Sequence, residues 1–169
     1  TKYGYWTSTK RPATAEAWDA VGLAYGDPAA PVRKVLFAVD PTIEVAQEAA
    51  AWGADLLVVH HPLFLKAVHG FAATTPKGRT LATLAGAGCA LLTAHTNADL
   101  AAGGVSEAMA SALGLSDVAP LLPVDGAGGI GTGRIGSVAE TSLSDFAATV
   151  ARALPATAHG VRVAGDPER

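Results

Sequence analysis

Short apolar runs alternate with segments of helical character along the first two thirds of this chain, and that alternation limits the folds it can adopt. Apolar runs typical of strands occupy 33–39, 55–60 and 89–94. Segments that favour helix follow them, at about 40–53, 79–87 and 105–113. Parallel strands need long crossover connections, so strand and helix in this order indicate a mainly parallel sheet flanked by helices. The expected fold class is therefore α/β.

Local signals place the ends of individual helices. Asp40 and Pro41 predict a helix start, with Asp40 as N-cap and Pro41 at the first helical position, where a missing N–H does no harm. Gly53 predicts the end of that helix. Nearer the N-terminus, residues 15–21 favour a short helical segment, with Trp18 as an anchor in the core.

A change of composition predicts a boundary in the second half of the chain. Residues 116–129 are rich in proline, glycine and aspartate, so we expect a first lobe at 13–118, a linker at 119–129 and the start of a second lobe at 130–169. In that second lobe, a strand at 133–138 precedes a helix capped by Ser142, and another strand starts at 160. A lobe made only of a strand, a helix and the start of another strand would leave the edge of its sheet uncovered, so the second lobe is expected to be truncated.

Composition excludes several classes of function. The longest apolar runs fall short of the roughly 18 residues of a membrane span, and residues 1–12 lack the apolar centre of a secretion signal. A net charge of −3 gives no electrostatic footprint for nucleic acid. The single cysteine, Cys89, allows no disulfide within the chain and is expected to be a buried thiol in the core. We expect a cytoplasmic protein that binds neither membrane nor nucleic acid.

Two adjacent histidines stand at the end of the second apolar run, in Asp55-Leu-Leu-Val-Val-His-His-Pro62. Side chains alternate along a strand, so His60 and His61 are predicted to point apart. Pro62 favours extended geometry for the residue before it. Two imidazoles that diverge from one strand end suit two neighbouring metal ions better than one. The alternative is a pair of histidines at the core or rim that binds no metal.

A third histidine follows the next strand, in His95-Thr-Asn-Ala-Asp99, where Asp99 lies four residues on in a predicted polar loop. Ligands in parallel sheets gather at the carboxyl ends of strands, and all three histidines lie at such ends. Imidazole and carboxylate ligands suit zinc, iron or manganese. Asp99 could instead cap the following turn. His95 could bind an ion or hydrogen-bond beside the ligands.

Four stretches of the sequence resemble a known family, the dinuclear metal-centre proteins, also called Nif-three-like or GTP cyclohydrolase I type 2 proteins. The stretches, in order, are Glu16-Ala-Trp-Asp-Ala-Val-Gly-Leu23, Asp55-Leu-Leu-Val-Val-His-His-Pro-Leu63, His95-Thr-Asn-Ala-Asp99 with Gly104-Val105, and Gly131-Thr-Gly-Arg-Ile-Gly136. The resemblance spans about 15–165, and the histidine pair with the downstream His-Thr-Asn-x-Asp is a specific combination.

The resemblance implies two similar lobes around a cleft that holds two divalent metal ions. By position it implies His60, His61 and Asp99 as ligands, with His95 beside them. Family members tend to form hexamers built from dimers, so a homo-oligomer is expected. The family's further ligands, a histidine and a glutamate four residues apart, would lie beyond the end of this sequence.

The chemistry expected of such a centre is metal-assisted hydrolysis. Two ions can activate a water molecule and orient a substrate. His95 could carry a proton, since the pKa of a free histidine lies near neutrality. The family name suggests a nucleotide-like small molecule, GTP, as substrate, although the residues themselves show no guanine pocket and identify no catalytic residue. The alternatives are a metal-binding regulatory or scaffold protein without turnover, and metals that only stabilise the fold.

Overall fold

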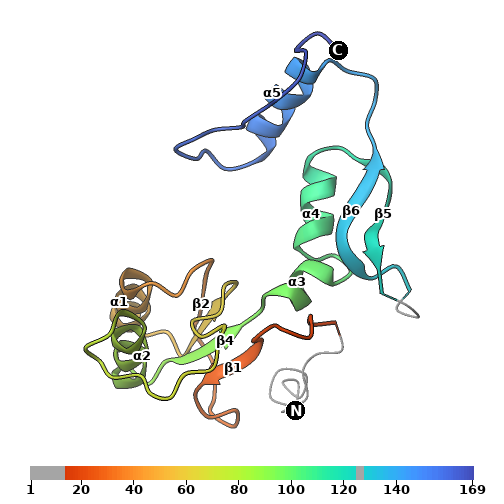
Figure 1. Cartoon of the computed structure of the whole chain (residues 1–169). Helices are drawn as coiled ribbons and strands as arrows, with labels where there is room; N and C mark the ends of the chain where they lie inside the picture. The colour runs from red at the N-terminus through yellow and green to blue at the C-terminus, as the bar shows by residue number, and fades with distance from the viewer. Residues whose placement is uncertain (1–13, 125–127) are drawn as a thin grey trace. The chain divides into compact units, whose positions relative to one another are not determined.

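The computed structural model describes residues 14–124 and 128–169, which form two compact units that meet in sequence between Ala98 and Asp99 (Figure 1). The first unit contains a mixed sheet and two long helices. The second contains a hairpin and further helices. Each unit is described by itself below.

The sheet of the first unit has the strand order β1-β4-β3-β2. Its strands are β1 (Gly22–Tyr25), β2 (Val35–Ala38), β3 (Leu56–Val59) and β4 (Ala90–Thr93). Strands β2, β3 and β4 are parallel, which confirms the mainly parallel sheet predicted from sequence. Strand β1 pairs antiparallel with β4 at the edge and was not predicted.

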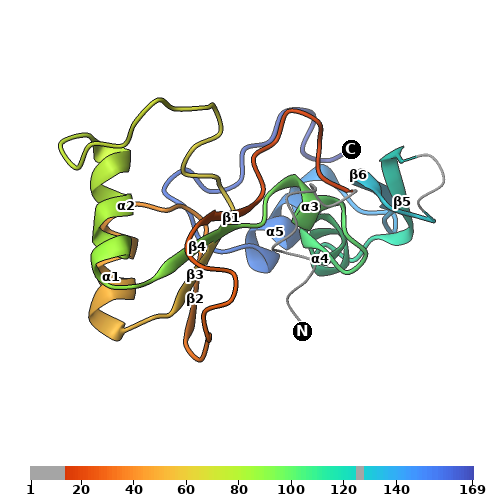
Figure 2. The same ribbon diagram turned by 90° about the horizontal axis from the view of Figure 1, so that it is seen from below.

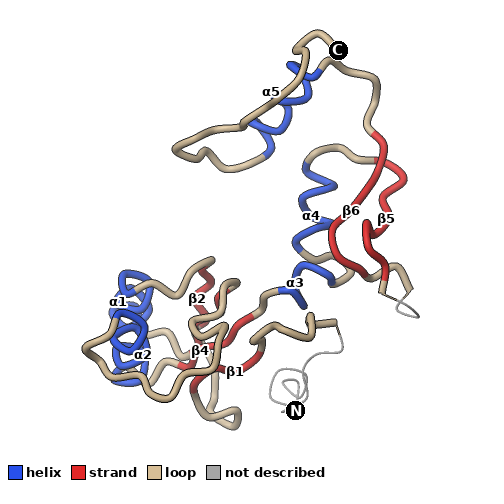
Figure 3. The backbone as a smooth tube through the Cα atoms, viewed as in Figure 1, coloured by secondary structure: helices blue, strands red, loops and turns tan. Residues whose placement is uncertain are grey.

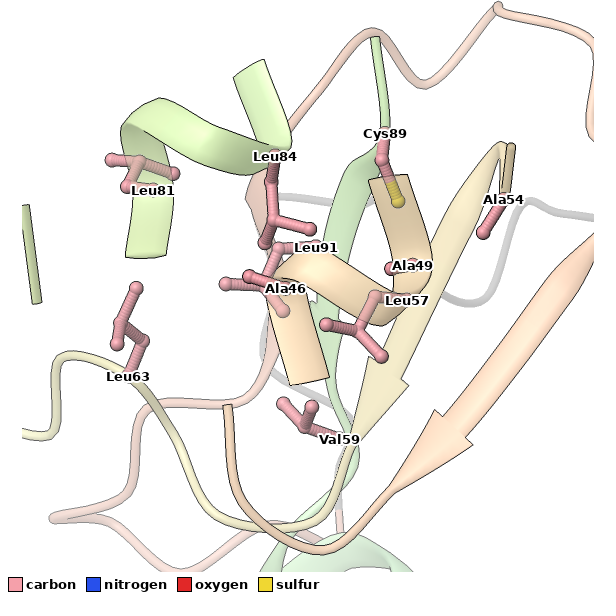
Figure 4. Packing of buried hydrophobic residues seen from close by; sticks show 10 residues of the cluster. All are labelled: Ala46, Ala49, Ala54, Leu57, Val59, Leu63, Leu81, Leu84, Cys89 and Leu91. Atoms are coloured by element: carbon pink, nitrogen blue, oxygen red, sulfur yellow. The ribbon is translucent and has the colours of Figure 1, made fainter. Parts of the chain in front are cut away.

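Helices α1 (Ile43–Trp52) and α2 (Pro76–Gly86) lie against one face of this sheet (Figure 2). Figure 4 shows the core that forms between them and the strands. Its buried members are Ala46, Ala49, Ala54, Leu57, Val59, Leu63, Leu81, Leu84, Cys89 and Leu91. Cys89 is buried as predicted, and desolvation raises the pKa of its thiol, so it is a structural group. On the other face, Phe37 and its neighbours line an apolar groove of about 380 Å³.

The start of α1 differs from the prediction. Its N-cap is Thr42, whose hydroxyl accepts the Val45 N–H, and not Asp40. Threonine and aspartate are both good caps, so sequence alone does not choose between two candidates two residues apart. The carboxylate of Asp40 accepts a hydrogen bond from His61 instead. Gly53 ends the helix as predicted, at φ 71°.

The segment before β1 also differs from the prediction. Residues 15–21 form turns and irregular backbone where a helix was expected. Trp18, the predicted core anchor, has 60% of its surface exposed. Its neighbour Asp19 is buried instead, with 1% exposure. Trp18 points outward because the hydrogen-bonded carboxylate of Asp19 occupies the buried position beside it.

The second unit contains a hairpin of β5 (Ser116–Pro123) and β6 (Gly131–Ser137), with α4 (Val105–Ala112) in contact with β6 (Figure 3). Helix α5 (Leu143–Ala153) begins at the predicted N-cap Ser142, whose hydroxyl accepts the Asp145 N–H. One expectation was wrong here, because 160–163 forms no strand. Strand β5 occupies the first part of the expected linker, 119–129, whose role as a boundary stays a prediction. Residues 125–127 lie outside the described residues.

Helix α3 (Thr96–Leu100) begins directly after His95 and runs across the boundary between the two units. A polar loop was expected at this place. Among the described helices, none combines the length and the apolar character needed to cross a lipid bilayer.

Candidate metal centre

Three histidines meet where β3 and β4 end. His60 and His61 directly follow β3, and His95 lies two residues after β4. One ring nitrogen of each histidine lies within 4.8 Å of those of the other two. The ring centroids are 5.1 Å apart for His60 and His61, 5.1 Å for His60 and His95, and 5.7 Å for His61 and His95. We call these three residues the histidine cluster.

The predicted divergence of His60 and His61 was wrong. Strand β3 ends at Val59, and both histidines lie in a bend where strand alternation no longer applies. The N–H groups of His60 and His61 both donate to the carbonyl of Val39, at 3.2 and 2.9 Å. Consecutive N–H groups in a strand would point in opposite directions. The bend therefore turns both side chains toward His95.

Each ring of the histidine cluster is held by a hydrogen bond at Nδ1. His60 Nδ1 contacts the carbonyl of Ala94 at 3.0 Å. His61 Nδ1 contacts Asp40 Oδ1 at 2.7 Å, and His95 Nδ1 contacts Asp19 Oδ1 at 2.8 Å. A carbonyl and a carboxylate can only accept, so Nδ1 carries the proton in all three rings. In the neutral rings, the lone pair then lies on Nε2.

This tautomer suits metal binding. A histidine that binds a metal donates its other ring N–H to a carbonyl or carboxylate, which fixes the ring and makes the ligand more basic. Two nitrogens on one ion, at about 2.0–2.1 Å each, can be no more than about 4.2 Å apart. The 4.8 Å spacing thus needs shifts below about 1 Å for a shared ion. The donor set fits a divalent transition metal.

Asp19 is a residue of this centre that the sequence prediction missed. Its side chain is fully buried, and that of His95 is 17% exposed. Oδ1 accepts from His95 Nδ1 and from the Ala20 N–H, and Oδ2 accepts from the Thr96 N–H and the Thr96 hydroxyl. Burial opposes ionisation, but hydrogen bonds from His95, Thr96 and Ala20 outweigh it and lower the pKa of Asp19.

The sequence contained one signal for Asp19, because the Trp-Asp pair lies within the first stretch that resembles the family.

The two residues after His95 also have structural roles. Thr96 holds Asp19 and also accepts the Glu16 N–H at 3.1 Å. Asn97 accepts the His95 N–H at 3.0 Å and so fixes the start of α3.

Asp99, the predicted carboxylate ligand, lies in α3 and belongs to the second unit. It is four residues from His95, and its role as a ligand stays a prediction. His69, in the loop after the histidine pair, is exposed and is not a member of the histidine cluster.

A cavity of about 470 Å³ opens beside His61 within the first unit. Asp40 and Thr42 line it near the start of α1, and Lys77 and Arg79 line it in the first turn of α2. Its volume lies within the range of small-molecule pockets, roughly 300–1,000 Å³. The cavity offers a ligand both signs of charge next to one imidazole of the histidine cluster.

Comparison with known proteins decides the family. The sequence profile of the Duf34/NIF3 (NGG1p interacting factor 3) family matches residues 4–169. This chain belongs to the Duf34/NIF3 family. A "GTP cyclohydrolase 1 type 2 homolog" of Streptomyces coelicolor is 52% identical to this Duf34/NIF3 chain over 157 residues, which is 91% of the chain and 55% of that relative. A protein of the same name in Mycobacterium tuberculosis is 50% identical over 69% of the chain and 30% of its own length.

Solved structures agree with the Duf34/NIF3 assignment. A Staphylococcus aureus hypothetical protein aligns with a TM-score of 0.74 at 28% identity, and the alignment covers 84% of this chain and 59% of that one. A Bacillus cereus protein related to NIF3 aligns with a TM-score of 0.62 at 37% identity over 66% of this chain and 31% of that one. The chain thus spans about half the length of its Streptomyces relative.

Proposed function

We propose that this chain binds divalent transition-metal ions at the histidine cluster and belongs to a metal-dependent hydrolase. The observation that carries the proposal is that each of the three rings has its Nδ1 tied to an acceptor, while ring nitrogens lie within 4.8 Å of one another. Fixing three polar side chains at the edge of a sheet costs conformational entropy, and packing alone gives little in return.

His60 and His61 are the proposed ligands from the bend after β3, and Asp99 is the proposed carboxylate ligand. His95 lies beside them as a further ligand or as a group that carries a proton. Bound ions would supply an activated water molecule and a Lewis acid for hydrolysis. Two ions, of zinc, iron or manganese, are the proposed content of the complete centre.

The residues around the histidine cluster have separate parts in this proposal. The carbonyl of Ala94 and the carboxylates of Asp19 and Asp40 orient the rings. The cavity beside His61 gives space for a substrate. The relatives' name, GTP cyclohydrolase 1 type 2 homolog, motivates a nucleotide as the substrate.

Metal titration tests the binding proposal. Isothermal titration with Zn²⁺ should show a loss of about 10-fold or more in affinity for His60→Ala and His61→Ala, because each change removes one ligand. His69→Ala is the matched control, since His69 is an exposed histidine on the following loop. Metal analysis of the loaded protein gives the number of ions per chain. Equal affinity in all four proteins would refute the binding site.

Turnover is tested in the full-length protein loaded with metal. A panel of nucleotides that includes GTP should reveal hydrolysis in the wild type, and His61→Ala should abolish it while circular dichroism stays unchanged. Equal background rates in both proteins would contradict a hydrolase and leave a metal-binding protein without turnover. Light scattering of the same sample tests the proposed homo-hexamer.

A further inference from the structure

The segment before β1 contributes a buried carboxylate to the histidine cluster. Asp19 lies 76 residues before His95, and its Oδ1 accepts the Nδ1 proton of that ring at 2.8 Å. The ring of exposed Trp18 also lies edge-on to His95, with 6.1 Å between ring centroids. Two consecutive residues of one segment thus contact the ring.

Four donors among the described residues hold the carboxylate of Asp19, so that it can hardly rotate. Each oxygen accepts one backbone N–H, from Ala20 at 2.7 Å and from Thr96 at 3.0 Å. These donors belong to the segment before β1 and to the start of α3. His95 is therefore tied to a carboxylate that is itself fixed on both sides.

We propose that Asp19 is a positioning residue of the metal centre, whose carboxylate holds the His95 ring in the orientation and tautomer that present Nε2 to an ion. This inference rests on the proposed metal-binding function. It assigns a role to the described residues before β1, 14–21, which supply no ligand of the histidine cluster. Asp19 acts through His95 and has no direct part in the chemistry.

Substitution by asparagine addresses this role directly. The partners of Asp19 described above all donate to its carboxylate, so the NH2 group of Asp19→Asn faces a backbone N–H in either orientation. When its nitrogen takes the Oδ1 position beside His95, the amide donates to Nδ1 and moves the ring proton to Nε2, where it blocks metal binding. The wild-type carboxylate cannot do this because it has no proton to donate.

The experiment has two readouts on the full chain. Nitrogen-15 NMR of the metal-free wild type, at about pH 8–9 where free imidazole is neutral, should show the His95 proton on Nδ1. The Asp19→Asn variant should populate the Nε2–H form and lose about 10- to 100-fold in Zn²⁺ affinity by titration calorimetry. Asp27→Asn is the matched control, because Asp27 is an exposed aspartate that accepts one backbone N–H, and it should leave both readouts unchanged.

The outcomes separate this inference from the proposed function. A wild-type His95 proton on Nε2, or an unchanged Zn²⁺ affinity in folded Asp19→Asn, would overturn the role of Asp19. If the variant does not fold, the tautomer of the wild-type ring decides by itself. A wild type that binds no Zn²⁺ would refute the proposed function, and the positioning role of Asp19 in a metal centre would be refuted with it.

Discussion

Asp19, whose carboxylate is fully buried, and His95 form a carboxylate–imidazole pair at 2.8 Å, and the histidine cluster contains a second such pair at its surface. In the second pair, Asp40 Oδ1 contacts His61 Nδ1 at 2.7 Å, but the side chains are 59% and 50% exposed. Water can replace an exposed partner such as Asp40 more readily than it can replace the fully buried carboxylate of Asp19. The two pairs have the same geometry and are expected to differ in strength.

Asp40→Asn tests this difference. We expect it to lower Zn²⁺ affinity by less than about 10-fold, below the range of 10- to 100-fold for changes to a fixed partner of a metal-binding histidine. Solvent can take over the hydrogen bond to His61 Nδ1, because that ring is half exposed. Titration calorimetry of Asp40→Asn beside Asp19→Asn makes the comparison. A larger loss for Asp40→Asn would show that exposure does not rank the two pairs.

Thr96→Val tests how the segment before β1 is attached to α3. The change keeps the shape but removes the hydroxyl that donates to Asp19 and accepts the Glu16 N–H. Hydrogen bonds to charged groups are worth about 1.5–3 kcal/mol, and we expect the free energy of unfolding in urea to fall by that amount.

Thr83→Val is the matched control for this change. The Thr83 hydroxyl donates to the Arg79 carbonyl within α2, which the helix also satisfies, so we expect a loss below about 1 kcal/mol. Equal losses for the two valine variants would mean that the Thr96 hydroxyl has no special role.

Asp55 makes the stability of the fold depend on pH in the acidic range. Hydrogen bonds from the N–H groups of Lys34 and Arg33, both 2.8 Å from Oδ2, hold its pKa below the usual range of an aspartate. A lowered pKa in the folded state means that the unfolded state binds more protons. The stability from Asp55 is therefore fully present above the unfolded pKa of about 3.9 and is lost as pH falls through the folded pKa.

The variant Asp55→Asn should remove this dependence. We expect wild type to be more stable in urea at about pH 6, and the difference to shrink as pH falls below about 3.9. Glu48→Gln changes an exposed carboxylate on α1 and should leave the pH profile of wild type intact. A difference between Asp55→Asn and wild type that grows in acid would contradict the assignment.

Much of the fold could be predicted because its signals are local. Continuous apolar runs identified β2, β3 and β4, and a capping serine identified the start of α5. Strand β1 was missed because two of its four residues, Gly22 and Ala24, are of types that are depleted in strands. The choice of N-cap for α1 failed because Thr42 is an equally good cap two residues further on, and Asp40 contacts His61 instead.

The site was predicted only in the part that lies at strand ends. His60, His61 and His95 follow two adjacent parallel strands, so topology alone brings them together. Asp19 could not be found in this way, because its hydrogen-bond partners are 76 and 77 residues away. The predicted directions of the His60 and His61 side chains were wrong because the prediction extended the strand to residue 60, whereas β3 ends at Val59.

Metal binding should stabilise the first unit. An ion that binds only the folded chain adds about 2.7 kcal/mol to the free energy of unfolding at 100 times its dissociation constant. We expect Zn²⁺ to raise the melting temperature of wild type and of His69→Ala, and a chelator to reverse the change. His60→Ala should respond weakly, since it lacks one ring of the histidine cluster. A rise of equal size in His60→Ala would place the bound ion elsewhere.

Two glycines of α2 should respond oppositely to alanine. A Cβ at Gly78 would lie 2.1 Å from the carbonyl oxygen of Ala72, so Gly78→Ala must displace the loop before the helix. We expect a loss of about 1–3 kcal/mol in the free energy of unfolding. A Cβ at Gly86 would have no atom within 4 Å, so Gly86→Ala should add about 0.4–1 kcal/mol by restricting the unfolded chain. Urea unfolding measures the stability of both variants. A stabilised Gly78→Ala would show that the loop at Phe71 and Ala72 can move without a loss of stability.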